Sequence, residues 1–169
     1  VAHVDQIQHP VVRNVLKFLG IDGGIEIASM ADIPSKGSGL GSSSSYAVAL
    51  LHALYTYNNS YISKSDLGRL ASYIEIELCG DPIGKQDQYA AAFGGLNLIR
   101  FHEDDSVSVD PIICKPETES RLRDSILVFY TGRTRSASRL LSEQSKNMAD
   151  SKKRKLMGRM VQLAFEMKV

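Results

Sequence analysis

Apolar residues recur at helical spacing in several segments of the chain. Valines and leucines lie three and four positions apart in His9–Leu19, which predicts an amphipathic helix that ends at Gly20. The same criterion predicts further helices over about 43–57 (alanine-rich and mostly buried), from Ser63 or Ser65 to about Cys79, over 85–93, over 136–148 and over 151–167.

Shorter apolar runs between these helices predict strands. Ile25–Met30 is a predicted strand, Leu96–Phe101 and Val107–Val109 form a predicted pair around the Asp104-Asp105 turn, and Ile126–Tyr130 is a strongly apolar strand. Helices and strands are mixed without regular alternation, so we expect an α+β fold with a partly antiparallel sheet.

Composition narrows the function classes. The chain has 169 residues, 43% of them hydrophobic, and a net charge of +1, which indicates a globular domain without the field expected of a nucleic-acid or membrane binder. No apolar stretch approaches the ~20 residues of a membrane span. The two cysteines have neither metal nor disulfide spacing. We therefore expect a cytoplasmic protein that binds neither nucleic acid nor a membrane.

A glycine- and serine-rich loop, Gly37–Ser45, lies between a predicted strand and a buried helix. Glycines at the alternate positions 37, 39 and 41 let the backbone turn tightly and approach a ligand closely. Backbone N–H groups and the helix N-terminus then face one space, which favours a phosphate. The serine hydroxyls can bind phosphate oxygens or Mg²⁺. A flexible loop before a capped helix is the alternative interpretation.

Three other glycine motifs fit this loop poorly. A Walker A loop needs a lysine directly before the Ser or Thr that opens the helix, but Gly41 precedes Ser42. A Rossmann fingerprint needs different glycine spacing and an acidic residue ~20 positions later. A nucleophile elbow needs a glycine two residues after its serine, and Gly41–Ser45 lacks one.

Two segments instead resemble the GHMP kinases. Gly39-Leu40-Gly41-Ser42-Ser43-Ser44 is similar to the ATP loop of that family, with Pro34 one residue further away than usual, and Gly80–Gln88 is similar to its catalytic segment. The segments Gly84–Gly95 and Phe129–Ser138 resemble the corresponding sequences of the family's sugar kinase branch, which includes heptose phosphate and L-fucose kinases.

The resemblance implies a fold. Residues 1–125 would form the family's two-layer, ribosomal-protein-like N-terminal ATP-binding domain without its first strands. Residues 126–169 would begin its ferredoxin-like α+β C-terminal domain. The family's first and third motifs are not found in the chain, so we expect it to be truncated.

It also implies an ATP-dependent sugar kinase. The acceptor would be the anomeric hydroxyl of a heptose 7-phosphate, or L-fucose as an alternative. Asp87 would be the catalytic base, and Mg²⁺ would be held by Ser43 (or Ser42) and Glu75 (or Glu77). The triphosphate would be bound by Gly37, Gly39, Leu40, Gly41, Ser42, Ser43 and Ser44.

Three basic residues are further substrate candidates. Lys85, Arg133 and Arg135 could grip a sugar phosphate, or they could be solvated surface residues. The oligomeric state stays open, with a homodimer as one option. Two other functions also stay open: a non-catalytic or truncated phosphate- or nucleotide-binding module, and an interaction domain whose serine loop is structural. Asp87 and Glu75 favour the kinase, because a binding module has no need for a base.

Overall fold

The computed structural model describes residues 3–31, 39–129, 141 and 150–167. The described chain falls into two compact units, one formed by the residues up to Phe93 together with Leu141, and the other by the remaining residues from Gly94 onward. In the described part of the chain, no helix is both long enough and apolar enough to cross a membrane.

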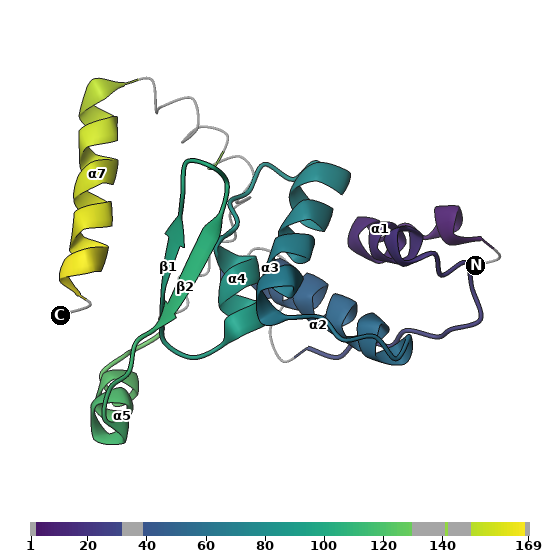
Figure 1. Cartoon of the computed structure of the whole chain (residues 1–169), viewed down its shortest axis with the longest axis horizontal. Coiled ribbons are helices and arrows are strands. Elements are labelled where there is room, and N and C mark those ends of the chain that lie inside the picture. Colours follow the sequence, from purple (N-terminus) through teal and green to yellow (C-terminus); the bar gives the residue numbers. More distant parts are fainter. Residues whose placement is uncertain (1–2, 32–38, 130–140, 142–149, 168–169) are drawn as a thin grey trace. The chain divides into compact units, whose positions relative to one another are not determined.

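The first unit is helical. Its elements are a 3₁₀ turn (η1, Val4–Gln6), α1 (Pro10–Leu19), α2 (Ser42–Tyr57), α3 (Lys64–Tyr73), a π-helix (η2, Ile74–Leu78) and α4 (Gln86–Phe93). Figure 1 shows α4 lying against α2 and α3, and α1 contacts α2 and η2. Their apolar faces form one core, whose fully buried members include Val15, Ala47, Leu51, Ala71 and Ile74.

Local sequence explains where these helices begin and end. Pro10 opens α1, where a missing N–H costs nothing, and Gly20 ends it at φ 66°. There the N–H of Ile21 donates to the Leu16 carbonyl at 2.9 Å, which is a Schellman arrangement. At the start of α3, the Ser63 hydroxyl accepts a hydrogen bond from the N–H of Asp66. The predicted helices in these regions are therefore confirmed, with Ser63 as the cap.

The π-helix continues directly from α3. Its five residues widen the helix, and the N–H of Cys79 donates to the carbonyl of Ile74 at 2.9 Å, five residues earlier. Single π turns inside helices are uncommon and often occur at functional sites. The sequence pattern predicted an uninterrupted helix to Cys79, so the π turn is a feature that the pattern did not reveal.

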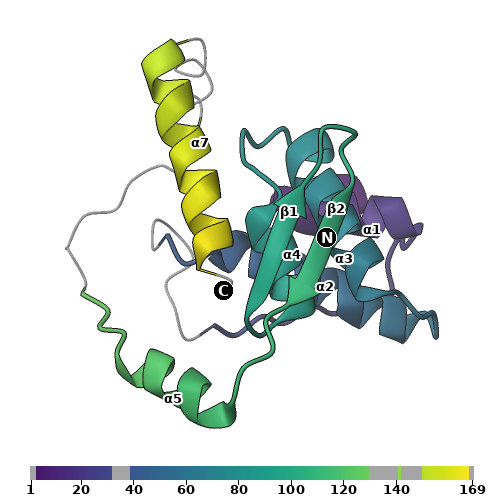
Figure 2. The same cartoon turned by 60° about the vertical axis from the view of Figure 1, so that its left-hand side comes forward.

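The second unit contains the only sheet in the described residues. Strands β1 (Asn97–Phe101) and β2 (Val107–Pro111) pair in antiparallel fashion, with Asn97 opposite Pro111 and Phe101 opposite Val107 (Figure 2). Asp105 turns the hairpin at φ 65°. This pair and its turn are confirmed. Two further helices are described here, α5 (Pro116–Asp124) and α7 (Ser151–Glu166).

Two predicted strands are wrong. Ile25–Met30 and the described part of Ile126–Tyr130 have no strand structure, and Ile126–Phe129 are exposed. A strand forms only where a neighbour completes its hydrogen bonds, and neither segment pairs with another among the described residues. The helix α5 was not predicted because its strongly charged sequence buries no residue. The predicted helix over 136–148 lies outside the described residues, apart from Leu141.

Candidate functional site

The glycine loop meets α2 at Gly41. This residue caps the helix at φ 67°, a left-handed conformation that glycine adopts without steric cost. It has no side chain to bond the first helical N–H groups, while the N–H of Ser45 already donates to the Gly41 carbonyl at 2.9 Å. The first turn of α2 therefore presents backbone donors, and the positive end of the helix dipole, toward the loop.

The carboxylate of Asp87 lies against this same glycine. A Cβ atom on Gly41 would be 3.2 Å from Oδ2 of Asp87 and 3.3 Å from its Cγ, closer than side chains normally pack. Asp87 itself is exposed on the first turn of α4. The absence of a side chain at position 41 thus allows the predicted base to lie beside the predicted phosphate loop.

Ser43 and Glu75 are joined directly. The hydroxyl of Ser43, in the first turn of α2, donates to Oε1 of Glu75 at 2.7 Å. Glu75 lies in the π-helix and is completely buried, whereas Glu77 in the same π turn is exposed. Of the alternatives left open by the sequence, Ser43 with Glu75 is the pair that the structure brings together.

Gln88 also contacts Glu75, and with Ser43 the three residues form a hydrogen-bonded cluster. Gln88, next to Asp87 on α4, is also completely buried, and its Nε2 donates to Oε2 of Glu75 at 2.6 Å. Glu75 therefore receives one hydrogen bond on each oxygen. Sequence reasoning assigned no role to Gln88. Its one signal was a polar side chain at the start of an otherwise alanine-rich helix, directly after Asp87.

The end of the π-helix is held from α1. Nδ2 of Asn14 donates to the Leu78 carbonyl at 3.0 Å and approaches Sγ of Cys79 at 3.3 Å. The N–H of Asp81 donates to the Glu75 carbonyl at 3.0 Å. Burial raises the pKa of the Cys79 thiol above its ordinary value, so the thiol is not activated as a nucleophile. The turn that carries Glu75 is thus anchored at both ends.

The other predicted residues are less closely grouped. Gly39 has φ 70° and nothing within 4 Å of the place where a Cβ would lie, Leu40 is exposed, and Ser44 is buried in the first turn of α2. Lys85 is half-buried directly before α4. Gly37, Arg133 and Arg135 lie outside the described residues. For these residues the predicted roles stay predictions.

The cluster has the donor set that Mg²⁺ accepts. Ser43 supplies a hydroxyl and Glu75 a carboxylate, both oxygen ligands suited to a hard cation. Over the described ranges, no three His, Cys, Asp or Glu residues gather as a ready-made metal cage. This fits Mg²⁺, which is usually bound by one or two protein groups with phosphate and water completing its coordination.

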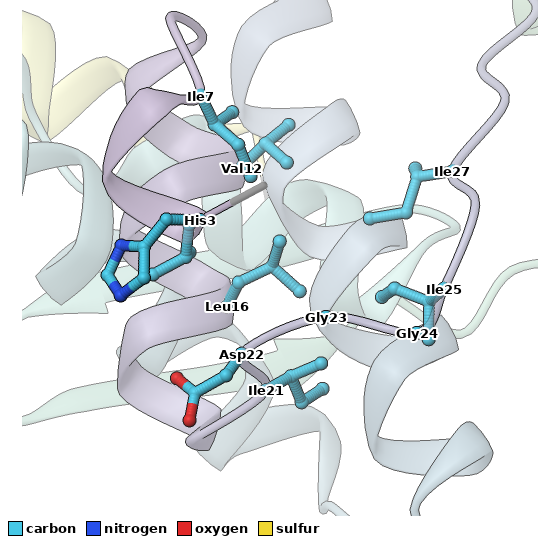
Figure 3. Close-up of a pocket in the computed structure, with 11 residues that line it drawn as sticks. His3, Ile7, Val12, Leu16, Ile21, Asp22, Gly23, Gly24, Ile25 and Ile27 are labelled. Carbon is cyan, nitrogen blue, oxygen red and sulfur yellow. The ribbon is translucent and has the colours of Figure 1, made fainter. Parts of the chain in front are cut away.

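A separate pocket lies away from these residues. Its volume is about 210 Å³, and apolar side chains of α1 and of the segment 21–27 line it, including Leu16, Ile21 and Ile25 (Figure 3). None of the predicted site residues lines it. The candidate site is instead the surface where the starts of α2 and α4 meet the π-helix.

The chain matches known proteins over the same region. The family model for the GHMP kinases N terminal domain matches residues 7–95. A D-glycero-alpha-D-manno-heptose 7-phosphate kinase of Campylobacter jejuni is 35% identical over 138 residues, which is 82% of this chain and 40% of that protein. An L-fucokinase/L-fucose-1-P guanylyltransferase of Bacteroides fragilis is 30% identical over 81% of this chain and 14% of that protein.

A solved structure agrees with these matches. The crystal structure of a D-glycero-D-manno-heptose 1-phosphate kinase from Bacteroides thetaiotaomicron has a TM-score of 0.61 and 30% identity, covering 83% of this chain and 46% of that one. The chain thus spans less than half the length of these relatives.

Proposed function

Because this chain belongs to the GHMP kinase family, as its motifs predicted, we propose that it carries the nucleotide site and catalytic base of an ATP-dependent sugar kinase. The acceptor we propose is a heptose phosphate, most simply the anomeric hydroxyl of a heptose 7-phosphate. Relatives whose names specify heptose phosphate kinases support this choice.

The observation that carries the proposal is the contact between Gly41 and Asp87. Oδ2 of Asp87 lies 3.2 Å from the place where a Cβ at position 41 would be, close to the backbone donors of α2. A binding module needs the donors alone. A kinase needs a carboxylate within reach of the transferred phosphoryl group, because the attacking hydroxyl must lose its proton there.

The residues of the proposed site have different parts in this reaction. Gly39, Gly41 and the first turn of α2 bind the triphosphate through backbone N–H groups. Ser43 and Glu75 would hold Mg²⁺, which would supply positive charge to the phosphates when bound. Asp87 orients the sugar hydroxyl and accepts its proton while the hydroxyl oxygen bonds to the γ-phosphorus and the bond from that phosphorus to ADP breaks.

The proposal is tested by following ADP release from MgATP. The full-length protein is assayed with heptose 7-phosphate, heptose 1-phosphate, L-fucose and galactose as acceptors. We expect turnover with heptose 7-phosphate well above that with the other sugars. Preferential turnover of L-fucose would favour the second candidate function, an L-fucose kinase, which the similarity to the Bacteroides fragilis relative supports. MgADP binding without turnover of any acceptor would instead indicate a non-catalytic nucleotide-binding module.

A further inference from the structure

Gln88 is the most deeply buried amide of the candidate site. Both it and Glu75 have no exposed surface, and the 2.6 Å contact between Nε2 and Oε2 joins α4 to the π-helix. Burying a glutamine side chain beside a carboxylate costs desolvation energy unless the hydrogen bond between them recovers it. A leucine or methionine would fill the same space without that cost. The Gln88 amide is therefore explained by its hydrogen bond to the Glu75 carboxylate and not by packing in the core.

The two hydrogen bonds on Glu75 fix its carboxylate plane. The terminal torsion of a glutamate is soft and roughly two-fold, so packing alone defines its orientation poorly. With Oε2 held by Gln88, Oε1 is directed at the hydroxyl of Ser43, 2.7 Å away. Removing the Gln88 donor would leave Ser43 as the single contact and free the carboxylate to rotate.

The other end of the Gln88 amide supports this interpretation. Its Oε1 is buried and has no hydrogen-bond partner among the residues that the structure describes. Leaving a buried acceptor unpaired is unfavourable, so native proteins rarely do so without a compensating gain. Here the orientation that leaves Oε1 unpaired is the one that directs Nε2 at Glu75. The carboxylate therefore determines how the amide is oriented.

We propose that Gln88 is a positioning residue that orients the Glu75 carboxylate toward the Ser43 hydroxyl, and so sets how tightly these two residues hold a divalent cation beside the nucleotide. This inference deepens the proposed function and rests on it. Gln88 touches neither the nucleotide nor the cation in this role; it acts through Glu75.

The test is Gln88→Met, which keeps the length and volume of the side chain but removes the amide donor. Binding is measured by titrating Mn²⁺ into the protein with saturating ADP and following water-proton relaxation. We expect the half-saturating Mn²⁺ concentration to rise about tenfold, which corresponds to roughly 1.4 kcal/mol. ADP affinity without metal and the unfolding temperature should stay close to those of the unsubstituted protein.

Gln86→Met is the matched control, because Gln86 is exposed at the first position of the same helix. It should leave Mn²⁺ binding unchanged. In a Glu75→Gln background, Gln88→Met should change Mn²⁺ half-saturation by less than about twofold, since a residue that acts through another has no separate effect once that partner is altered. Gln88→Asn, whose amide is too short to reach Glu75, replaces the methionine variant if that protein does not fold.

An unchanged Mn²⁺ half-saturation in Gln88→Met would overturn the proposal, as would equal effects with and without Glu75→Gln. Loss of stability and of metal-free ADP binding together would show that Gln88 is a structural residue only. Since no readout depends on turnover, these outcomes are distinct from failure of the kinase proposal. That failure would appear as MgATP that is bound but not consumed with any sugar.

Discussion

Gly41 and Asp87 are 46 positions apart in sequence, yet a Cβ atom on the glycine would lie 3.2 Å from Oδ2 of the aspartate. The first turn of α2 and the predicted base therefore lie so close together that a side chain at position 41 would have to displace the Asp87 carboxylate. Gly41 also needs its φ of 67°, which other residues adopt with difficulty. These two requirements can be separated by substitution.

Gly41→Ala should reduce both stability and turnover. The left-handed backbone would cost about 1–2 kcal/mol of the free energy of unfolding. The added methyl group would also displace the Asp87 carboxylate, so kcat should fall at least about tenfold beyond any effect on folding, since small misplacements of catalytic groups are costly. Chemical denaturation and initial-rate kinetics measure the two effects.

Gly20→Ala is the control for the loss of stability caused by the left-handed backbone conformation. Gly20 has nearly the same φ, 66°, and nothing lies within 4 Å of a Cβ there. Its substitution should lower stability to a similar extent while leaving kcat close to that of the unsubstituted protein. If both alanine variants lost the same fraction of kcat, the contact between position 41 and Asp87 would have no catalytic importance.

Asp87→Asn should abolish most turnover without disturbing nucleotide binding. The amide keeps the shape of the carboxylate but cannot accept the proton of the attacking hydroxyl, a contribution typically of about 10²–10⁴ in rate. Kinetics should show a loss in kcat, with ADP affinity within about twofold by calorimetry. Asp105→Asn in the hairpin turn is a suitable control, because asparagine tolerates its φ of 65°. Normal kcat in Asp87→Asn would exclude Asp87 as the base.

Sequence patterns predicted most of the helical unit because its helices have strong local signals. The apolar stripe of α1 ends at a glycine, and α3 begins at Ser63, which bonds the Asp66 N–H. Strands depend on partners that lie elsewhere in the chain, which is why the hairpin around Asp105 was predicted correctly and Ile25–Met30 was not. A local pattern contains no information about a missing neighbour.

The candidate site, like the fold, could be predicted from the sequence only in part. The resemblance to the GHMP kinases pointed to Ser43 (or Ser42), Glu75 (or Glu77) and Asp87, and the structure joins Ser43 to Glu75 and brings Asp87 close to Gly41. Position 75 could not be separated from 77 by sequence, since the choice depends on how a π turn directs each side chain. Nor could the role of Gln88 be predicted, because its hydrogen bond to Glu75 exists only once α4 has packed beside the π-helix.

Glu75→Gln should separate stability from function. The buried carboxylate accepts hydrogen bonds from two neutral donors, Ser43 and Gln88. The substituted amide can accept the Gln88 hydrogen bond through its oxygen and donate to the Ser43 hydroxyl oxygen through its nitrogen, so both contacts are kept while a buried charge is removed. Without nucleotide or metal, the variant should be as stable as the unsubstituted protein or more stable by about 1 kcal/mol.

Turnover of the same variant should fall by at least about tenfold at limiting Mg²⁺, because an amide is a weaker ligand for a hard cation than a carboxylate. Glu75→Leu is the comparison, since it leaves the buried Gln88 amide unpaired and should cost about 1–3 kcal/mol. Thermal denaturation distinguishes the two variants. A Glu75→Gln protein as unstable as Glu75→Leu would contradict the proposed hydrogen bonds of the substituted amide to Ser43 and Gln88.

Gly68→Ala probes how closely α3 supports α4. A Cβ on Gly68 would lie 3.0 Å from Cδ1 of the buried Tyr89 ring and 3.3 Å from its Cα, so the start of α4 must move to admit it. Alanine is favoured over glycine inside a helix by about 1 kcal/mol, but overpacking costs about 1–3 kcal/mol. We expect a net loss of stability of about 1 kcal/mol, and lower kcat because Asp87 and Gln88 move with Tyr89.

Gly158→Ala is the control, because a Cβ in this part of α7 has nothing within 4 Å; this variant should gain up to about 1 kcal/mol of stability with unchanged kcat. Equilibrium denaturation of the two variants should therefore give shifts of opposite sign, and a stabilising effect at position 68 would show that α3 and α4 are not in tight contact there.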